Sequence, residues 1–453
     1  MMLTLAQAAH SLQSGRDTAQ GLVEAALARA QDPAGEGARV YTELHADAAR
    51  AAAQASDLLR ARGLARSPLE GLPISVKDLF DIAGRTTRAG SVVLADAPPA
   101  TRSALVVERL QAAGAIVIGR SNMTEFAYSG LGINPHYGTP LNAWDRATGR
   151  IPGGSSSGAA VSVTDGMALA GIGSDTGGSV RIPAALCGLT GFKPTARRVP
   201  MDGVLPLSAH LDSLGPIAPS VACCVLLDAV MAGESWDDLP QALPLAGLRL
   251  AVPTTKVLDG MDGTVARVFE RACATLRQAG VHVTEIALSE LAEVADINAK
   301  GGFTAAEAWA WHRGLIAQAQ DRYDPRVVSR IRRGSEQSAA DFIDLLAARR
   351  QWITRVTARI APYDALLMPT VPVVAPPLAE LVRDETAYFH FNALMLRNAT
   401  YINFLDGCAI SVPAQMPGEA PVGLMLAGAA GRDRQVLAMG AAVEACLQAA
   451  RGA

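Results

Sequence analysis

Aromatic residues make up only 5% of this 453-residue chain, although half of its residues are hydrophobic. The core is therefore expected to be large and aliphatic. No apolar run approaches the roughly 20 residues that a helix needs to span a bilayer, and the first residues lack the basic and apolar regions of a secretory signal. These absences predict a cytoplasmic protein that does not cross a membrane.

Metal and disulfide patterns are lacking as well. The six cysteines are scattered without a CxxC pair, and the seven histidines show no HExxH or HxH spacing. We therefore expect buried free thiols, no metal site and no bound cofactor. The net charge of −3 gives no electrostatic reason to expect a nucleic-acid or anionic membrane partner.

Short apolar runs alternate with amphipathic stretches along most of the chain, which is typical of an α/β sheet. Expected strands lie at 72–76, 115–118, 169–173, 248–252, 281–286, 364–374 and 408–412, and expected helices at 104–113, 159–167, 264–279 and 337–360. Three parts follow one another: N-terminal helices (1–67), a central core (68–220) and a C-terminal part (245–453) that completes the sheet. The glycine-rich stretch 129–158 has no regular pattern, and a long loop of this kind inside a domain is usually functional.

Lysine is rare, since only four of the 40 basic residues are lysines, namely Lys77, Lys193, Lys256 and Lys300. Arginine cannot give up its proton in a protein, whereas a desolvated lysine can become a neutral base. Lys77 follows the apolar run 72–76, which would desolvate its amine and lower its pKa. An ordinary lysine at the end of a strand is the alternative interpretation, and Lys193 is a weaker candidate for a base.

Two glycine-rich segments carry serines. In residues 153–158 (GGSSSG) the glycines permit unusual backbone angles and close approach to a ligand, although a linker or a helix cap at Ser156 or Ser157 would also explain them. Residues 173–181 (GSDTGGSVR) run from a strand into a glycine turn, which can aim successive N–H groups at an anion. Ser179 would then have an oxyanion hole beside it, and a capped strand–helix connection is the simpler alternative.

Lys77, Ser155 and Ser179 together supply a base, a bridging hydroxyl and a nucleophile for acyl transfer. Residues 154–158 also fit the G-x-S-x-G elbow of Ser-His-Asp esterases, with Ser156 as the nucleophile. That elbow needs a preceding strand, which residues 150–153 do not suggest. It also needs a histidine, and none of the later ones stands in a distinctive context: His210, His282, His312 and His390.

The sequence resembles a known family in several segments. Residues 153–195, GGSSSGAAVSVTDGMALAGIGSDTGGSVRIPAALCGLTGFKPT, closely resemble the central motif of the amidase signature family. Residues 71–78 (GLPISVKD) are similar to its lysine segment, 134–140 (NPHYGTP) to its substrate-side loop and 421–426 (PVGLML) to its closing strand. The departures are mild. Ser157 and Ser174 stand where Gly and Thr are common and remove no catalytic group, and Ala143 replaces a common Pro in the loop that leads to the active site.

The resemblance implies a single large α/β/α domain over residues 1–453, with a central mixed β-sheet covered by helices. It also implies a Ser–cis-Ser–Lys triad of Ser179, Ser155 and Lys77, with a cis peptide bond between Gly154 and Ser155. The oxyanion hole would be formed by the backbone N–H groups of Thr176, Gly177, Gly178 and Ser179. We expect substrate contacts from Tyr128, Ser129 and Gly130.

The implied function is hydrolysis of an amide-type C–N bond through a serine acyl-enzyme, and aryl amides, esters and carbamates suit the same chemistry. One alternative is a glutaminase-like subunit of an amidotransferase complex, which would need partner proteins. Another is a non-catalytic protein that binds an anion at its glycine turn. We expect a small-molecule amide as the substrate and a monomer or homodimer.

Overall fold

One mixed sheet of 11 strands organises the chain in the computed structural model, which describes residues 2–452. The strands lie side by side in the order β1-β3-β2-β4-β6-β5-β10-β11-β9-β7-β8. Their bounds are β1 Tyr41–Leu44, β2 Pro73–Lys77, β3 Ile116–Ser121, β4 Ala170–Ser174, β5 Thr190–Lys193, β6 Leu214–Ala218, β7 Arg249–Pro253, β8 His282–Ile286, β9 Ala365–Pro369, β10 Cys408–Pro413 and β11 Gly423–Gly428. Strand β2 is parallel to β3 and β4, and β7 is parallel to β8 and β9, whereas the strands between them pair antiparallel.

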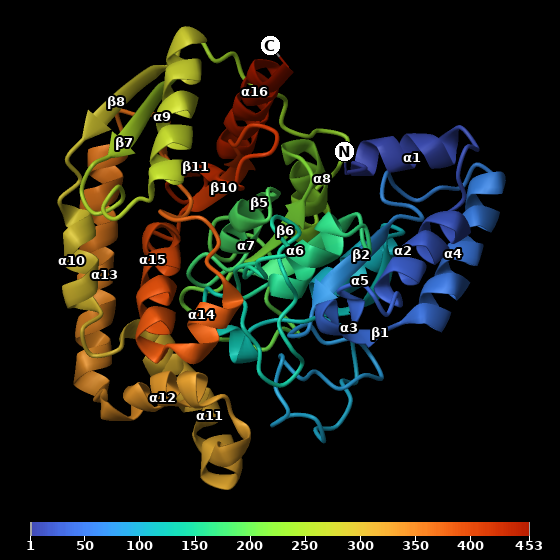
Figure 1. Ribbon diagram of the computed structural model, residues 1–453, viewed down its shortest axis with the longest axis horizontal. Coiled ribbons are helices and arrows are strands. Elements are labelled where there is room, and N and C mark those ends of the chain that lie inside the picture. The colour runs from blue at the N-terminus through green and yellow to red at the C-terminus, as the bar shows by residue number, and fades with distance from the viewer. Residues whose placement is uncertain (1, 453) are drawn as a thin grey trace.

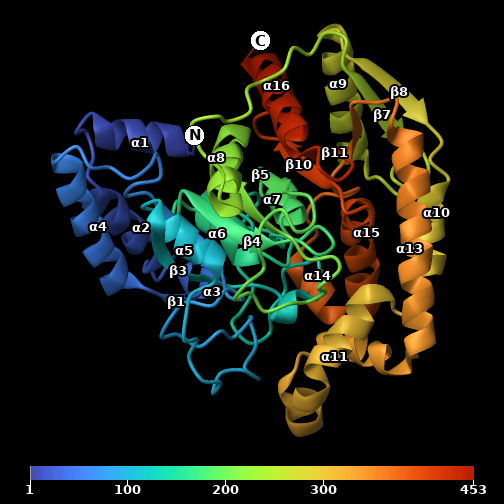
Figure 2. The same ribbon diagram turned by 180° about the vertical axis from the view of Figure 1, so that it is seen from behind.

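Helices surround this sheet. Their bounds are α1 Leu5–Gln13, α2 Ala19–Ala30, α3 Gly37–Val40, α4 Ala46–Ala61, α5 Leu105–Ala112, α6 Ser157–Thr164, α7 Arg181–Leu186, α8 Val221–Ala232, α9 Gly263–Gln278, α10 Glu290–Ile297, α11 Gly302–Ala319, α12 Pro325–Arg332, α13 Ala339–Ile360, α14 Leu378–Arg383, α15 Glu385–Phe404 and α16 Asp433–Gly452. Helices α1, α2 and α4 lie at one end of the molecule, and α10 and α13 lie at the other (Figures 1 and 2). Helix α11 extends from the lower side in both views, and α12 lies next to it in Figure 1. No helix among residues 2–452 is both long enough and apolar enough to cross a membrane.

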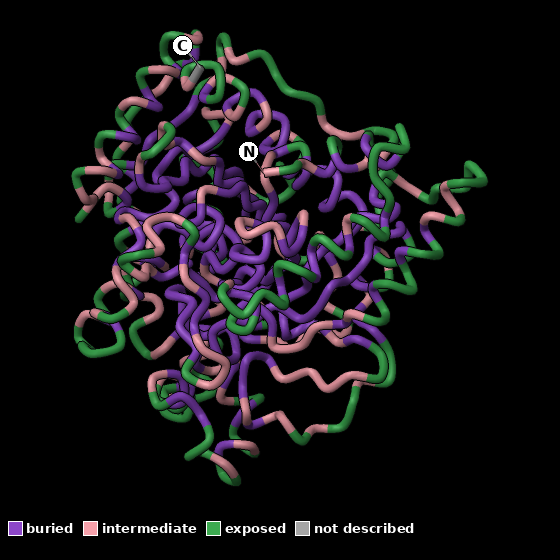
Figure 3. Tube along the Cα trace, turned by 45° about the vertical axis from the view of Figure 1, so that its right-hand side comes forward, coloured by how far each residue is buried: buried purple, intermediate pink, exposed green. Residues whose placement is uncertain are grey.

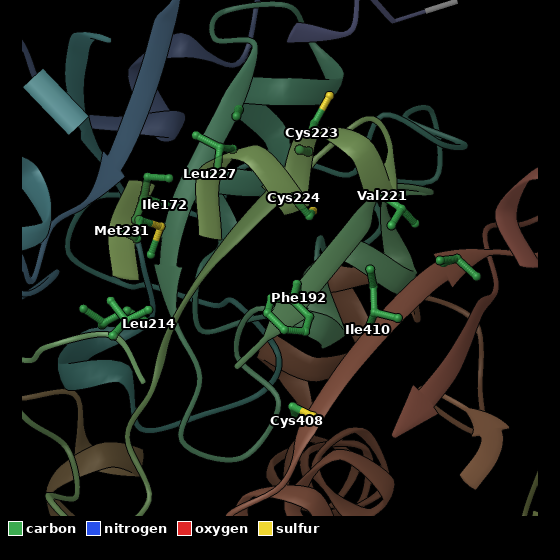
Figure 4. Packing of buried hydrophobic residues seen from close by; sticks show 14 of the residues in the cluster. Ile172, Phe192, Leu214, Val221, Cys223, Cys224, Leu227, Met231, Cys408 and Ile410 are labelled. Carbon is green, nitrogen blue, oxygen red and sulfur yellow. The ribbon is translucent and has the colours of Figure 1, made fainter. Parts of the chain in front are cut away.

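The core is aliphatic, as the composition predicts. Buried segments fill the middle of the molecule, and exposed ones follow its outer helices and loops (Figure 3). Side chains from β4, β5, β6, β10 and α8 pack together there, among them Phe192, Cys223 and Cys224 (Figure 4). All six cysteines are free thiols, and five of them are buried. The scattered cysteines therefore contribute to packing, which confirms the expectation of buried free thiols.

Most of the predicted strands and helices exist within one or two residues of their expected ends. Two strands differ more: 364–374 ends at Pro369 in β9, and 115–118 extends to Ser121 in β3. Helices α11 and α15, which were not expected, span 18 and 20 residues. Both lack a pronounced apolar stripe, because pocket-lining and core-facing residues occur on several of their faces, so helical periodicity was a weak signal there.

Candidate active site

Lys77 and Ser174 are the last residues of two neighbouring parallel strands, β2 and β4. The register pairs Val76 with Ile172, so the carboxyl ends of both strands meet at the same edge of the sheet. The Nζ atom of Lys77 donates hydrogen bonds to Oγ of Ser155 at 2.7 Å and to Oγ of Ser174 at 2.8 Å. The structure therefore brings the predicted base and the predicted bridging serine into direct contact.

Lys77 is fully buried. Burial lowers the pKa of its amine to about 7, and the more distant charges of Asp175 and Asp212 partly oppose this effect. Its two hydrogen-bond partners are neutral hydroxyls, which do not stabilise the ammonium form as a carboxylate would. A substantial fraction of Lys77 is therefore unprotonated near neutral pH, as a general base requires.

Ser155 lies in the segment that leads into α6, and its peptide bond with Gly154 is cis, as the family resemblance implies. The carbonyl of Ser155 accepts a hydrogen bond from the N–H of Thr124 at 3.1 Å. The next amide, that of Ser156, donates to the carbonyl of Ser179 at 3.3 Å. Within residues 2–452 no hydrogen bond joins the hydroxyls of Ser155 and Ser179, and the contact of the Ser156 amide with Ser179 links the two segments.

The turn before Ser179 is organised by the carboxylate of Asp175. This carboxylate accepts hydrogen bonds from the amide of Gly178 at 2.8 Å and from the guanidinium of Arg181 at 2.8 and 3.0 Å. Asn403, at the end of α15, donates to the same group. Burial alone would raise the pKa of Asp175, but Arg181, together with Lys193 and Asn403, more than offsets it and holds the pKa well below its usual range.

The expected oxyanion hole therefore has to be corrected at the amide of Gly178. Its hydrogen donates to Asp175 and is not free for a substrate oxygen. Among the described residues, the N–H groups of Thr176, Gly177 and Ser179 have no protein acceptor. An aspartate three residues before a glycine amide is a common local acceptor, so the sequence contained a signal for this arrangement.

A pocket of about 300 Å³ opens beside Thr176, Gly177 and Ser179. Most of its other lining residues come from the C-terminal part of the chain: Val294, Ala295, Asn298, Gly301, Phe303, Thr304, Arg330, Leu396, Thr400 and Phe404. Leu396, Thr400 and Phe404 are four residues apart on α15 and form one wall. The pocket thus combines residues 294–404 of the C-terminal part with residues 127–129, 207 and 211 of the central core.

Two of the three expected substrate-binding residues line this pocket, Tyr128 and Ser129. Gly130 does not, because its amide donates to Oδ1 of Asn392 at 2.9 Å and Leu396 packs against its Cα. Ser129 donates its hydroxyl to the same oxygen at 2.9 Å. The segment thus builds the pocket, but Gly130 lies behind its surface.

Arg330, on α12, was not anticipated. Its guanidinium donates to the carbonyl of Tyr128 and lies 4.4 Å from the centre of the Tyr128 ring. It is the one charged residue in the pocket lining of the described chain, and no carboxylate in residues 2–452 forms an ion pair with it. Nothing in the sequence around Arg330 separates it from the many other arginines, since its position depends on how α12 packs.

The esterase-like alternative finds no geometric support. No strand leads into Ser156 in the described structure, and its hydroxyl donates to the carbonyl of Ser174 at 3.4 Å. The nearest partners of two candidate histidines lie elsewhere, because His210 pairs with Glu307 and His312 with Tyr323. In the part of the chain that the structure describes, no three His, Cys, Asp or Glu side chains are grouped as metal ligands would be.

Several known proteins are similar to this chain over most of its length. The family model described as Amidase matches residues 21–437. The chain is 37% identical to the 2-amino-5-chloromuconic acid deaminase of Comamonas testosteroni, over 88% of this chain and 86% of the deaminase. It is 35% identical to a glutamyl-tRNA(Gln) amidotransferase subunit of Chloroflexus aggregans (strain MD-66 / DSM 9485), over 98% and 96% of the two chains. Among solved structures, the crystal structure of an amidase superposes with a TM-score of 0.86 at 33% identity and covers 98% of this chain and 99% of that one.

Proposed function

The chain belongs to the amidase signature family of hydrolases that act on C–N bonds, and on this premise we propose that it cleaves amides through a serine acyl-enzyme. Ser179 is the nucleophile, Ser155 the bridging hydroxyl and Lys77 the base. The observation that carries this proposal is the 2.7 Å contact between Ser155 and a fully buried lysine whose pKa is about 7. A hydroxyl that contacts an unprotonated amine can pass a proton to it.

In the proposed cycle, Lys77 takes a proton from Ser155 while Ser155 takes one from Ser179. The oxygen of Ser179 attacks the substrate carbonyl, and the negative oxygen that forms is held by the free N–H groups of Thr176, Gly177 and Ser179. The C–N bond then breaks, and the leaving amine receives its proton back through Ser155. Water repeats the same steps on the acyl-enzyme and releases the acid.

A fluorophosphonate probe tests the nucleophile. Wild-type protein should be labelled on Ser179, and Ser179→Ala should lose both the label and the amidase activity. Ser156→Ala is the matched control, because Ser156 is another buried serine of the same region, and it should keep the label. Labelling of Ser156 in the Ser179→Ala protein would contradict the proposal and favour the elbow mechanism.

The substrate class follows from Arg330. A single cation without an acidic partner, in a small and otherwise uncharged pocket, favours a substrate that carries a carboxylate. The related deaminase from Comamonas testosteroni is named for a substrate that is an acid, which agrees with this interpretation. We therefore infer a small acyl amide with a carboxylate near the scissile bond; esters and carbamates of the same acid would use the same chemistry.

Arg330→Met tests this inference. Loss of a charge-assisted hydrogen bond should lower kcat/KM for a carboxylated amide by about 10- to 100-fold, and should change kcat/KM for a neutral amide of similar size by less than about threefold. Arg326→Met is the matched control, because Arg326 is one turn earlier on α12 and lies over the ring of Tyr388, outside the pocket lining. An equal loss on both amides would show that Arg330 only supports the pocket wall.

A glutaminase-like subunit is the second candidate, and the similarity to an amidotransferase subunit over nearly the whole of both chains favours it. Purification separates the two. A stand-alone amidase, which we expect as a monomer or homodimer, should hydrolyse its amide at full rate after purification to homogeneity. The amidotransferase component would release ammonia from glutamine slowly by itself and much faster when its partner proteins are added.

A further inference from the structure

Two buried carboxylates hold the turn that carries the proposed oxyanion hole. Asp175 binds it through the Gly178 amide. Asp212 binds it at Thr176, because its Oδ1 accepts the hydroxyl hydrogen of Thr176 at 2.5 Å. The cycle described above uses neither carboxylate, and Asp212 stands outside every motif that the sequence singled out.

Asp212 belongs to the loop before β6, and its carboxylate also accepts hydrogen bonds from two amides of this loop. Its Oδ2 accepts the amides of Leu207 and Ser208 at 2.9 and 3.0 Å. Leu207 and Leu211 of this loop line the pocket. One carboxylate thus joins the pocket wall to the side chain of Thr176, whose N–H is among those with no protein acceptor.

The loop is in turn fixed to α11 by Glu307. The carboxylate of Glu307 accepts a hydrogen bond from the hydroxyl of Ser208 and pairs with Nδ1 of His210. The ring of His210 lies 5.1 Å from that of Phe303, which lines the pocket. Asp212 therefore cannot shift without disturbing contacts on two sides.

We propose that Asp212 is a positioning residue, which holds Thr176 through its hydroxyl and so keeps the N–H groups of Thr176 and Gly177 where the substrate oxygen becomes negative. Donors fixed in advance stabilise a transition state more than a ground state. Misplacing them should therefore lower kcat and leave KM nearly unchanged. This inference rests on the proposed serine mechanism.

A double-mutant cycle of Thr176→Val and Asp212→Ala tests it on the full chain. Each single variant should lower kcat by about 10- to 100-fold with KM within about threefold of wild type. The double variant should be no slower than the slower single variant, because both substitutions remove the same hydrogen bond. Thr176→Ser restores the hydroxyl and should recover most of kcat. If Asp212→Ala does not fold, Thr176→Val and Thr176→Ser still decide the question.

The charge of Asp212 gives a separate readout. Burial raises the pKa of Asp212 to about 6, so its carboxylate is charged near pH ~7 and above. Asp212→Asn removes this charge, which raises the pKa of Lys77, so the acid limb of kcat/KM should move to lower pH. Thr176→Val keeps the charge and should leave the limb in place. The charged groups near Lys77 that remain in both variants are Asp175 and its partner Arg181. Asp228→Asn, which changes a buried carboxylate paired with Arg198, is the control for general destabilisation and should move neither kcat nor the limb.

The inference is overturned if Thr176→Val keeps kcat within about twofold of wild type, if the losses of the two single variants multiply in the double variant, or if KM rises in place of the fall in kcat. Fluorophosphonate labelling of Ser179 is measured first on each variant. Failed labelling of the wild type would reject the serine mechanism itself, while normal labelling with a failed cycle would reject only the role of Asp212.

Discussion

Two strand ends in this protein carry a fully buried lysine, and they surround it differently. Lys77 ends β2 and contacts the hydroxyls of Ser155 and Ser174. Lys193 ends β5 and donates to the backbone carbonyls of Pro194 at 2.7 Å and Gly407 at 2.6 Å. Burial lowers both pKa values, to about 7 for Lys77 and about 8 for Lys193.

The two lysines differ in whether their hydrogen-bond partners can give up a proton. A carbonyl oxygen only accepts hydrogen bonds, so Lys193 must act as a donor and ties β5 to the segment before β10. A hydroxyl both donates and accepts, so Lys77 can receive a proton from Ser155 when its amine is neutral. A depressed lysine pKa therefore does not by itself identify a base; the chemistry of the contacting atoms does.

Substitution of the two lysines should differ most in its effect on activity. Lys77→Arg should lower kcat/KM for an amide by about 10³-fold, nearly as much as Lys77→Ala, because arginine keeps the charge but cannot accept a proton. Lys193→Met should leave kcat/KM of the folded protein within about fivefold of wild type. Steady-state kinetics on purified, folded variants provide the measurement. A Lys77→Arg enzyme within about threefold of wild type would show that Lys77 supplies charge and not proton transfer.

The pH dependence should be the next largest effect. Only unprotonated Lys77 can act as the base, so kcat/KM should fall about tenfold per pH unit below an apparent pKa near 7 and level off above it. Lys193→Met should retain the same acid limb. Rates measured from about pH 5.5 to about pH 8.5 separate the two lysines. A flat profile, or a limb that disappears with Lys193, would reverse their roles.

The smallest effect is on thermal stability, and we expect opposite signs. The pKa of Lys77 is lower in the folded chain than the unfolded value of about 10.4. The unfolded chain therefore binds more protons between about pH 7 and about pH 10.4, so the free energy of unfolding rises with pH across this range. Below it the folded chain bears the full cost of a buried ammonium. Lys77→Met removes that cost and should raise Tm by about 1–3 °C near about pH 6.

Lys193→Met should lower Tm instead, because it leaves two buried carbonyls without a donor. Scanning calorimetry of both variants near about pH 6 and about pH 9 provides the measurement. The gain from Lys77→Met should shrink at the higher pH, where wild-type Lys77 is neutral. If both variants raised Tm equally, desolvation alone would dominate and the hydrogen-bond partners would matter little.

Much of the candidate site could be predicted from the sequence because its signals are local. The scarcity of lysine leaves four candidates, and the apolar run before Lys77 favours it and predicts both β2 and the lowered pKa. The glycine turn before Ser179 can likewise be predicted from nine consecutive residues. The parallel pairing of β2 with β4, which places Lys77 next to Ser174 at one sheet edge, came from the structure.

The tertiary structure decided everything that depends on contacts between distant segments. It assigned the Gly178 amide to Asp175, placed Gly130 behind Leu396, and brought Arg330 over Tyr128, a residue 202 positions earlier in the chain. Catalytic motifs are set by neighbours a few residues apart, so the order of residues alone reveals them. A pocket wall depends on how whole helices such as α11, α12 and α15 pack. That packing depends on shape and buried area over hundreds of residues, and no short sequence pattern encodes it.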